Sequence, residues 1–206
     1  MKPADTKIYL ASKSPRRREL LRQIGVEFEL LLLRGESPRG PDVNEDALPD
    51  EAPDVYVARV TRDKAEYAAK TMLWRRLPMR PILAADTTVT IDGRILGKPA
   101  NADEAFDMLK SLSGRTHEVL TSIALWHDEN VWQATQVSKV TFAKVSDDML
   151  RAYCATPEPF DKAGAYGVQG LAAVFIEHIA GSYTGIMGLP LFETAQLLRN
   201  VGVQVP

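Results

Sequence analysis

Apolar residues recur along this chain with two different spacings, and the change from one to the other predicts a protein of mixed strands and helices. Short apolar runs bounded by turn residues are typical of buried strands. Apolar positions three and four residues apart, preceded by capping residues, are typical of amphipathic helices. The predicted strands cover residues 7–11, 26–33, 82–91, 94–96, 116–126, 131–142 and 171–179. The predicted helices run from Pro15 to Gly25, over 54–72, from Asn101 to Gly114, over a short stretch after Ser146, and from Pro190 to about Gly202.

Turn residues mark where these elements begin and end. Pro15 directly after Ser14 is a strong helix start, because proline suits the first helical position and serine can cap it. Residues 34–54, with four prolines, seven acidic and two basic side chains, predict an exposed and mobile loop. Because strands and helices follow no regular alternation, we expect an α/β fold. It has a mixed, twisted sheet flanked by helices, in a single domain spanning residues 1–206.

Composition narrows the class of protein. Of 206 residues, 45% are hydrophobic and 25% are charged, so the chain can bury a core. Its 27 acidic and 25 basic side chains give a net charge of −2, which provides no general positive field for nucleic acid or an anionic membrane. Cys154 is the single cysteine, and neither a secretory signal nor an apolar run near the ~20 residues of a membrane span is found. We therefore expect a cytoplasmic protein with a small-molecule partner, and neither a nucleic acid polymer nor a membrane.

The turn between the first predicted strand and the first helix has the strongest chemical character. Residues 12–18 read Ser-Lys-Ser-Pro-Arg-Arg-Arg. A helix start offers unpaired N–H groups and a partial positive charge, and hydroxyl and guanidinium groups stand beside it here. The segment predicts a receptor for phosphate or carboxylate. The alternative is a solvated basic turn, although basic residues at a helix start oppose the helix dipole.

Asp86 is the second candidate, because an apolar strand leads directly into this carboxylate. A buried, unpaired carboxylate costs several kcal/mol, so a cation, a lysine or a water that it deprotonates should lie against it. Lys64 falls on the inward face of its predicted helix, and Lys98 stands in a rigid Gly-Lys-Pro turn across the hairpin from Asp86. Both lysines are expected to point at one shared anion. The alternatives are a snorkelling side chain for Lys64 and a plain turn lysine for Lys98.

Other reaction classes find little support in the sequence. The glycine-rich stretch 164–170 precedes a predicted strand, whereas the dinucleotide-binding fingerprint follows one. Residues 93–98 are one residue short of a P-loop and are followed by Pro99. The three histidines lack zinc-ligand spacing, and the chain has no Gly-x-Ser-x-Gly elbow.

Several motifs, in order along the chain, resemble those of one family, the Maf nucleoside triphosphate pyrophosphatases. The similarity runs from Leu10 to about Leu198. The motifs occupy residues 11–17, 84–87, 96–99, 112–117, 161–170 and 188–190. The resemblance implies an ITPase-like fold with two lobes around a central cleft, a homodimer, and Mg²⁺ or Mn²⁺ as cofactor. It also implies hydrolysis of a nucleoside triphosphate between the α and β phosphates, which gives the monophosphate and pyrophosphate.

The resemblance also implies roles for individual residues. Asp86 would accept the proton of the attacking water and contact the metal. Ser12, Arg16 and Arg17 would hold the phosphates. Lys64 and Lys98 would neutralise their charge. A second metal carboxylate is expected after the second strand, where residues 42–45 are the nearest match, displaced by an apparent insertion at 35–41. We therefore expect Glu45, with Glu36 as the alternative.

Base preference follows from the same resemblance. Arg17, Thr87 and Gln169 match positions that mark the branch of the family acting on dTTP and UTP. The Gln169 amide offers one donor and one acceptor, which suits the edge of uracil or thymine. We expect pyrimidine triphosphates, modified ones included, as substrates. The alternatives are the family branch acting on 7-methylguanosine triphosphate, a nucleotide-binding regulator without catalysis, and a nucleic-acid-binding module.

Overall fold

One mixed sheet forms the centre of the protein. The computed structural model describes residues 7–34 and 41–205. In this part of the chain, seven strands pair in the order β2-β1-β3-β5-β6-β7, and β4 joins β3 beside β1. The strands are β1 (Ile8–Leu10), β2 (Phe28–Leu30), β3 (Ile82–Ile91), β4 (Arg94–Leu96), β5 (Thr116–His127), β6 (Asn130–Phe142) and β7 (Ile176–Ala180). β1 is parallel to β2 and β3, whereas the other pairs are antiparallel.

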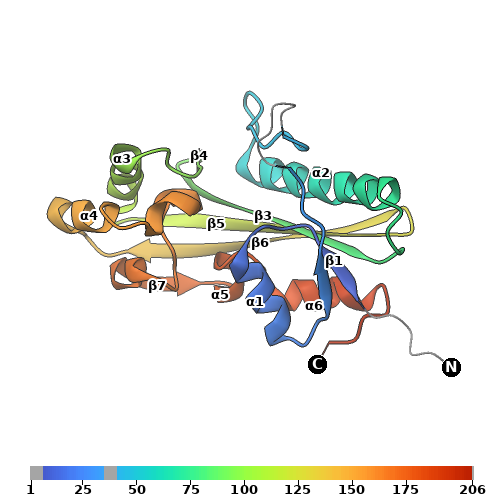
Figure 1. Ribbon diagram of the computed structural model, residues 1–206. Coiled ribbons are helices and arrows are strands. Elements are labelled where there is room, and N and C mark those ends of the chain that lie inside the picture. The colour runs from blue at the N-terminus through green and yellow to red at the C-terminus, as the bar shows by residue number, and fades with distance from the viewer. Residues whose placement is uncertain (1–6, 35–40, 206) are drawn as a thin grey trace.

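Helices cover the sheet on both faces (Figure 1). They are α1 (Pro15–Gln23), α2 (Pro53–Trp74), α3 (Ala102–Leu112), α4 (Asp147–Cys154), α5 (Tyr183–Ile186) and α6 (Leu191–Arg199). Three short 3₁₀ turns cover Glu158–Asp161, Ala163–Ala165 and Leu171–Phe175. The mixed α/β sheet flanked by helices that the sequence predicts is confirmed.

The core has two parts, which we call the β1 half and the β7 half. In the β1 half, alternate residues of β3 face opposite sides: Ile82 and Ala84 pack with α2, and Leu83 and Ala85 pack with α1 and α6. In the β7 half, Val89 and Ile91 pack with α3, α4 and an aromatic group that includes Phe142. The long strands β3, β5 and β6 run through both halves (Figure 1).

Two predicted strands are wrong in part. The predicted strand 171–179 begins with a 3₁₀ turn, and only Ile176–Ala180 is a strand. The carboxylate of Glu158 accepts hydrogen bonds from the N–H groups of Leu171 and Ala172, and these bonds support the turn. The predicted strand 26–33 pairs only over Phe28–Leu30.

The described part of the acidic loop, residues 41–52, is anchored at Asp42, whereas the sequence predicts a mobile segment. The Asp42 side chain is only 6% exposed and accepts hydrogen bonds from Arg34 and Tyr67. Residues 35–40, and Glu36 with them, lie outside the described residues. In the described ranges, no helix is long and apolar enough to cross a membrane.

Candidate active site

The candidate site lies at a gap along one edge of β3. On this edge, β1 pairs with Ile82 and Leu83, and β4 pairs with Val89 to Ile91. The stretch between them, residues 84–88, faces the segment where the chain leaves β1 and enters α1. Because neighbouring residues of a strand point to opposite faces, Asp86 reaches the α2 side and Thr87 reaches the α1 side.

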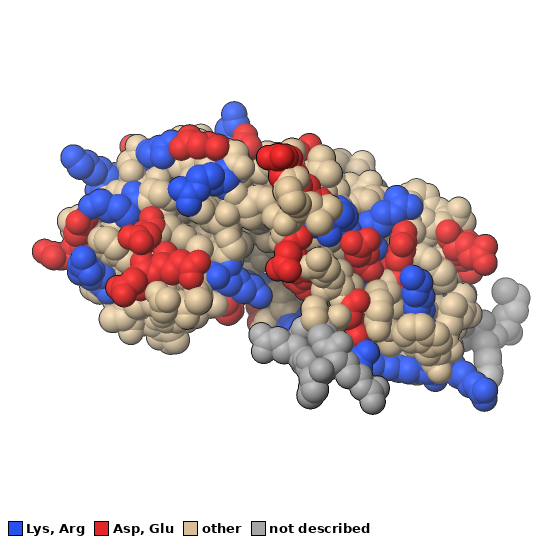
Figure 2. Space-filling view, turned by 90° about the horizontal axis from the view of Figure 1, so that it is seen from above, with Lys and Arg blue, Asp and Glu red and all other residues tan. Residues whose placement is uncertain are grey.

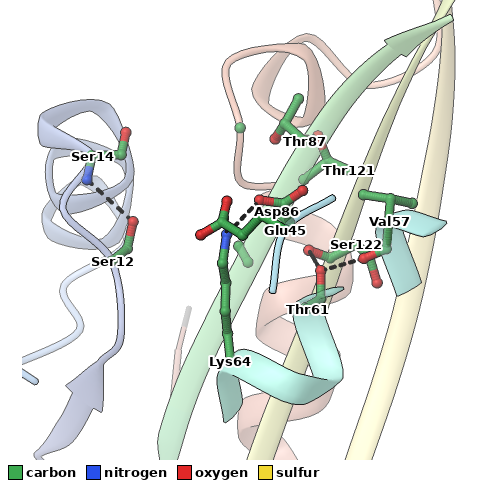
Figure 3. A network of polar contacts seen from close by, with 12 residues as sticks. Ser12, Ser14, Glu45, Val57, Thr61, Lys64, Asp86, Thr87, Thr121 and Ser122 are labelled. Carbon is green, nitrogen blue, oxygen red and sulfur yellow. Dashed lines mark hydrogen bonds and ion pairs between the residues drawn. The ribbon is translucent and has the colours of Figure 1, made fainter. Parts of the chain in front are cut away.

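Two carboxylates meet at a single ammonium group on the α2 side. Lys64 Nζ lies 2.7 Å from Asp86 Oδ1 and 2.9 Å from Glu45 Oε2. The side chains of Lys64 and Asp86 are 13% and 14% exposed, whereas that of Glu45 is 56% exposed. Figure 3 shows Lys64 rising from α2 to meet both acids, with Ser12 and Ser14 on the other side. The structure therefore brings together Asp86, Lys64 and Glu45, and Asp86 lies midway along β3.

The start of α1 forms the opposite wall. Ser14 caps the helix by accepting from Arg17 N at 3.5 Å, and Ser12 Oγ accepts from Ser14 N at 3.2 Å. The Arg16 side chain is 25% exposed and lies 3.3 Å from the Asp161 carboxylate. Backbone N–H groups, hydroxyls and one partly free guanidinium therefore gather at a helix start, an arrangement that suits an anion.

Arg17 links the start of α1 to β3 and to the segment at Gly188. Its Nε donates to Gly188 O at 2.7 Å, its Nη1 donates to Ala85 O at 2.8 Å and to Ser12 Oγ at 3.2 Å, and its Nη2 donates to Thr87 Oγ1 at 3.1 Å. These four contacts leave one of the five guanidinium N–H groups for another partner. Burial lowers the pKa of Arg17, while the nearby Asp86 carboxylate acts in the opposite direction.

Thr87 belongs to the same network. Its hydroxyl lies 2.9 Å from Thr121 Oγ1, which donates to Gly185 O at 2.7 Å. Because the Thr121 hydroxyl already donates its single proton to Gly185 O, the Thr87 hydroxyl must donate to Thr121 and accept from Arg17. The Thr87 hydroxyl can therefore only accept a hydrogen bond from a molecule bound in the cavity.

A cavity of about 660 Å³ opens between the acids and the start of α1. Lys98 and Gln169 also line it, as do Lys162, Tyr166 and Tyr56, none of which was predicted as a site residue. Lys98 is exposed, and its ammonium has no ion-pair partner among the residues that the structure describes. Figure 2 shows the surface hollowed between the two halves of the molecule.

The missed residues had weak signals or none. Lys162 stands at the start of the glycine-rich motif, and its Nζ donates to Asp161 Oδ1 at 2.5 Å and to Glu158 O at 2.7 Å. Its place within the motif 161–170 could have identified it as a site residue. Tyr56 lies one turn into α2 and looks in the sequence like any amphipathic helix residue.

The donor set suits a divalent cation that also binds substrate. In the described ranges, no group of three or more His, Cys, Asp or Glu side chains gathers as a metal cage. Asp86 and Glu45 are hard oxygen donors that already converge on a positive charge. Mg²⁺ is typically held by one or two carboxylates together with substrate phosphates, so these residues fit such an ion.

Comparison with known proteins identifies one family over nearly the whole chain. The profile of the family described as "Maf-like protein" matches residues 7–201. A dTTP/UTP pyrophosphatase of Aromatoleum aromaticum is 56% identical over 203 residues, which cover 98% of each chain. A dTTP/UTP pyrophosphatase of Ralstonia nicotianae is 54% identical over 95% of this chain and 94% of that protein.

Among solved structures, the Staphylococcus aureus Ham1 protein aligns with 66% of this chain and 72% of its own, at 16% identity and a TM-score of 0.44. That value is too low to support an argument. The family profile and the two relatives, in contrast, each match almost the whole chain. This chain therefore belongs to the Maf-like protein family.

Proposed function

We propose that this protein hydrolyses dTTP and UTP to the monophosphate and pyrophosphate. The observation that carries the proposal is the pairing of Asp86 and Glu45 on Lys64, across one cavity from the anion-binding start of α1. The relatives named dTTP/UTP pyrophosphatase support the same activity.

In the proposed reaction, Asp86 orients a water molecule and accepts its proton as the water attacks the α phosphorus. The start of α1, with Ser12 and Arg16, binds phosphate oxygens, and Arg17 offers its remaining N–H group. Lys64 and Lys98 offset the charge that builds up on the phosphates as pyrophosphate leaves.

We propose Mg²⁺ or Mn²⁺ as the cofactor, held by Asp86 and Glu45. A bound cation of this kind withdraws charge from the phosphates. The support is the convergence of the two carboxylates on one ammonium. Lys64 then has a second role, because its ammonium keeps the acids together before the metal arrives.

Thr87 and Gln169 are the proposed contacts to the base. A pyrimidine such as uracil has an imide N–H between two carbonyl groups, which an acceptor hydroxyl and an amide can match. The activity on 7-methylguanosine triphosphate is not favoured, because relatives at 47–56% identity carry the dTTP/UTP name. The same names also argue against the hypothesis of a nucleotide-binding regulator without catalysis.

The test is pyrophosphate release from a panel of natural and modified triphosphates with Mg²⁺. We expect release from UTP and dTTP, and we expect Asp86→Asn to fold while its turnover falls by roughly 10²–10⁴. Near-normal turnover in Asp86→Asn would overturn the role of Asp86. Release of orthophosphate in place of pyrophosphate would overturn the site of cleavage.

The expected setting of the enzyme is also part of the proposal. Resemblance to the family supports a homodimer, and the single cysteine supports a reducing cytoplasm. A cavity of about 660 Å³ suits a single nucleotide better than a polymer. A gel shift with DNA or RNA at low salt should therefore be negative.

A further inference from the structure

Glu45 stands in a stretch of chain that has no regular structure to hold it. Residues 41–52 form neither helix nor strand. The Glu45 side chain is more than half exposed, and its carboxylate pairs with Lys64 alone among the described residues. Where this carboxylate lies therefore depends on what fixes the backbone on either side of it.

Arg59 on α2 supplies most of that fixation. Its Nη2 donates to Asp46 O at 2.9 Å, and its Nη1 donates to Asn44 O at 3.5 Å. These carbonyls flank Glu45 on both sides. The same guanidinium grips the carboxylate of Glu51 through Nε at 2.6 Å and through Nη2 at 2.8 Å. One planar group thus ties three points of the loop to the helix, a geometry that lysine cannot reproduce.

Tyr56 closes the remaining position. Its hydroxyl donates to Glu45 O at 2.9 Å, and the guanidinium carbon of Arg59 lies 5.8 Å from the centre of its ring. Three consecutive carbonyl oxygens, from residues 44 to 46, are therefore held by two side chains one helical turn apart on α2. Burial raises the pKa of Tyr56 to about 12, and the nearby carboxylates act in the same direction.

Glu51 anchors the far end of the loop. Its side chain is only 5% exposed, and it also accepts from Leu48 N at 3.0 Å. Hydrogen bonds from Arg59 are the main reason that the pKa of Glu51 lies at about 2. The carboxylate therefore stays ionised, and the contact persists, at any pH at which the enzyme would work.

We propose that Arg59, assisted by Tyr56, is a positioning residue that holds Glu45 where it can bind the divalent cation together with Asp86. Lys64 lies on the same helix as Arg59, so α2 fixes both the carboxylate and the ammonium that faces it. The inference rests on the proposed function only in taking Glu45 as a metal ligand.

The test compares Arg59→Lys and Tyr56→Phe with Arg62→Lys. Arg62 lies on the same helix and pairs with Glu66 in an exposed i,i+4 contact, which makes it a matched control. We expect Arg59→Lys to weaken Mn²⁺ binding to the protein alone, measured by electron paramagnetic resonance, by about 10-fold, the lower end of the effect of losing an outer-shell contact. Tyr56→Phe should weaken it less, and Arg62→Lys should leave it unchanged.

Two further measurements separate positioning from general stability. Amide hydrogen exchange over residues 43–48 should speed up in Arg59→Lys and not in Arg62→Lys. The Mg²⁺ concentration that half-activates pyrophosphate release should rise by a similar factor, while kcat at saturating Mg²⁺ stays within about threefold.

Some outcomes would contradict the inference. Unchanged Mn²⁺ affinity in Arg59→Lys, or a loss of kcat that saturating metal does not restore, would overturn it. Unchanged Mn²⁺ affinity in Glu45→Gln would overturn it as well. Failure of the wild-type protein to release pyrophosphate from any triphosphate would instead refute the proposed function, and the Mn²⁺ and exchange data would still decide the role of Arg59.

Discussion

Lys64 places one ammonium between two carboxylates, and its removal would leave those carboxylates facing each other without a cation. Because two carboxylates that each lie within 2.9 Å of this ammonium repel each other once it is gone, we expect Lys64→Met to be destabilised in EDTA. Added Mn²⁺ should then raise its melting temperature by several degrees more than that of the wild type, since metal binding adds stability to the folded state. Lys70→Met, on the exposed face of the same helix, is the control. Equal Mn²⁺ shifts in the Lys64 variant and the wild type would contradict this expectation.

His117 makes stability depend on pH. It is 2% exposed, its Nε2 lies 2.7 Å from the Tyr166 hydroxyl, and burial lowers its pKa to about 4. The unfolded chain, with an ordinary histidine pKa near 6.5, binds the proton more readily, so stability is lost as pH falls from 6.5 toward 4. The slope should approach ~1.4 kcal/mol per pH unit in urea titrations below pH 6. His117→Gln should flatten it between pH 6.5 and 5, where few carboxylates titrate. An unchanged slope would show that other groups are responsible.

At the scale of the element, the glycine-rich segment depends on one tight approach. Gly164 has φ 68°, and a methyl group added there would lie 2.9 Å from Val89 Cγ1, in the core of the β7 half. We expect Gly164→Ala to lower the free energy of unfolding by about 2–4 kcal/mol, from left-handed backbone and overpacking together. Gly202→Ala is the control, because Gly202 has φ 75° with open space around it. Its cost should be about 1 kcal/mol. Equal losses in the two variants would mean that the contact with Val89 is unimportant.

How far the elements could be predicted depends on whether their signals are local. The cap at Ser14 and the proline after it indicate the start of α1, and that signal lies within four residues. The segment 171–175 is as apolar as a buried strand, and only the contact with Glu158 shows why it turns. That contact joins residues 13 apart, so the spacing of apolar residues along the chain does not predict it.

In the candidate site too, residues with a local signal could be predicted, and residues placed by distant contacts could not. Asp86 follows an apolar run and could be singled out, because a buried carboxylate requires a partner. That Lys64 is one such partner fits its place on the inward face of α2. The placement of Glu45 depends on Arg59 and Tyr56, which lie 11 to 15 residues away from the carbonyls that they hold. Arg17 was expected to hold phosphates, yet four of its donors meet the protein, and only the folded structure reveals those acceptors.

At the scale of the whole molecule, three long strands connect the two halves of the core. All three tryptophans lie in the β1 half: Trp126 and Trp132 pack in its clusters, and Trp74 ends α2. Because β3, β5 and β6 continue into the β7 half, we expect a single domain that unfolds in one step. Tryptophan fluorescence and far-UV circular dichroism should therefore give coincident urea transitions. A fluorescence transition displaced from the circular dichroism transition would indicate two independent units.

The gap on the edge of β3 sets a limit on how stable this protein can become. Residues 85–88 line the cavity, where a longer β1 or β4 could otherwise pair with them, and Arg17 donates to the Ala85 carbonyl there. An insertion that extended either strand would add ladder hydrogen bonds while filling the cavity proposed to bind the nucleotide. Selection for thermostability alone should therefore favour closure of this gap, and selection for turnover should keep it open. In the described part of the chain, this edge of the sheet stays unpaired along residues 85–88, where pairing would close the proposed substrate cavity.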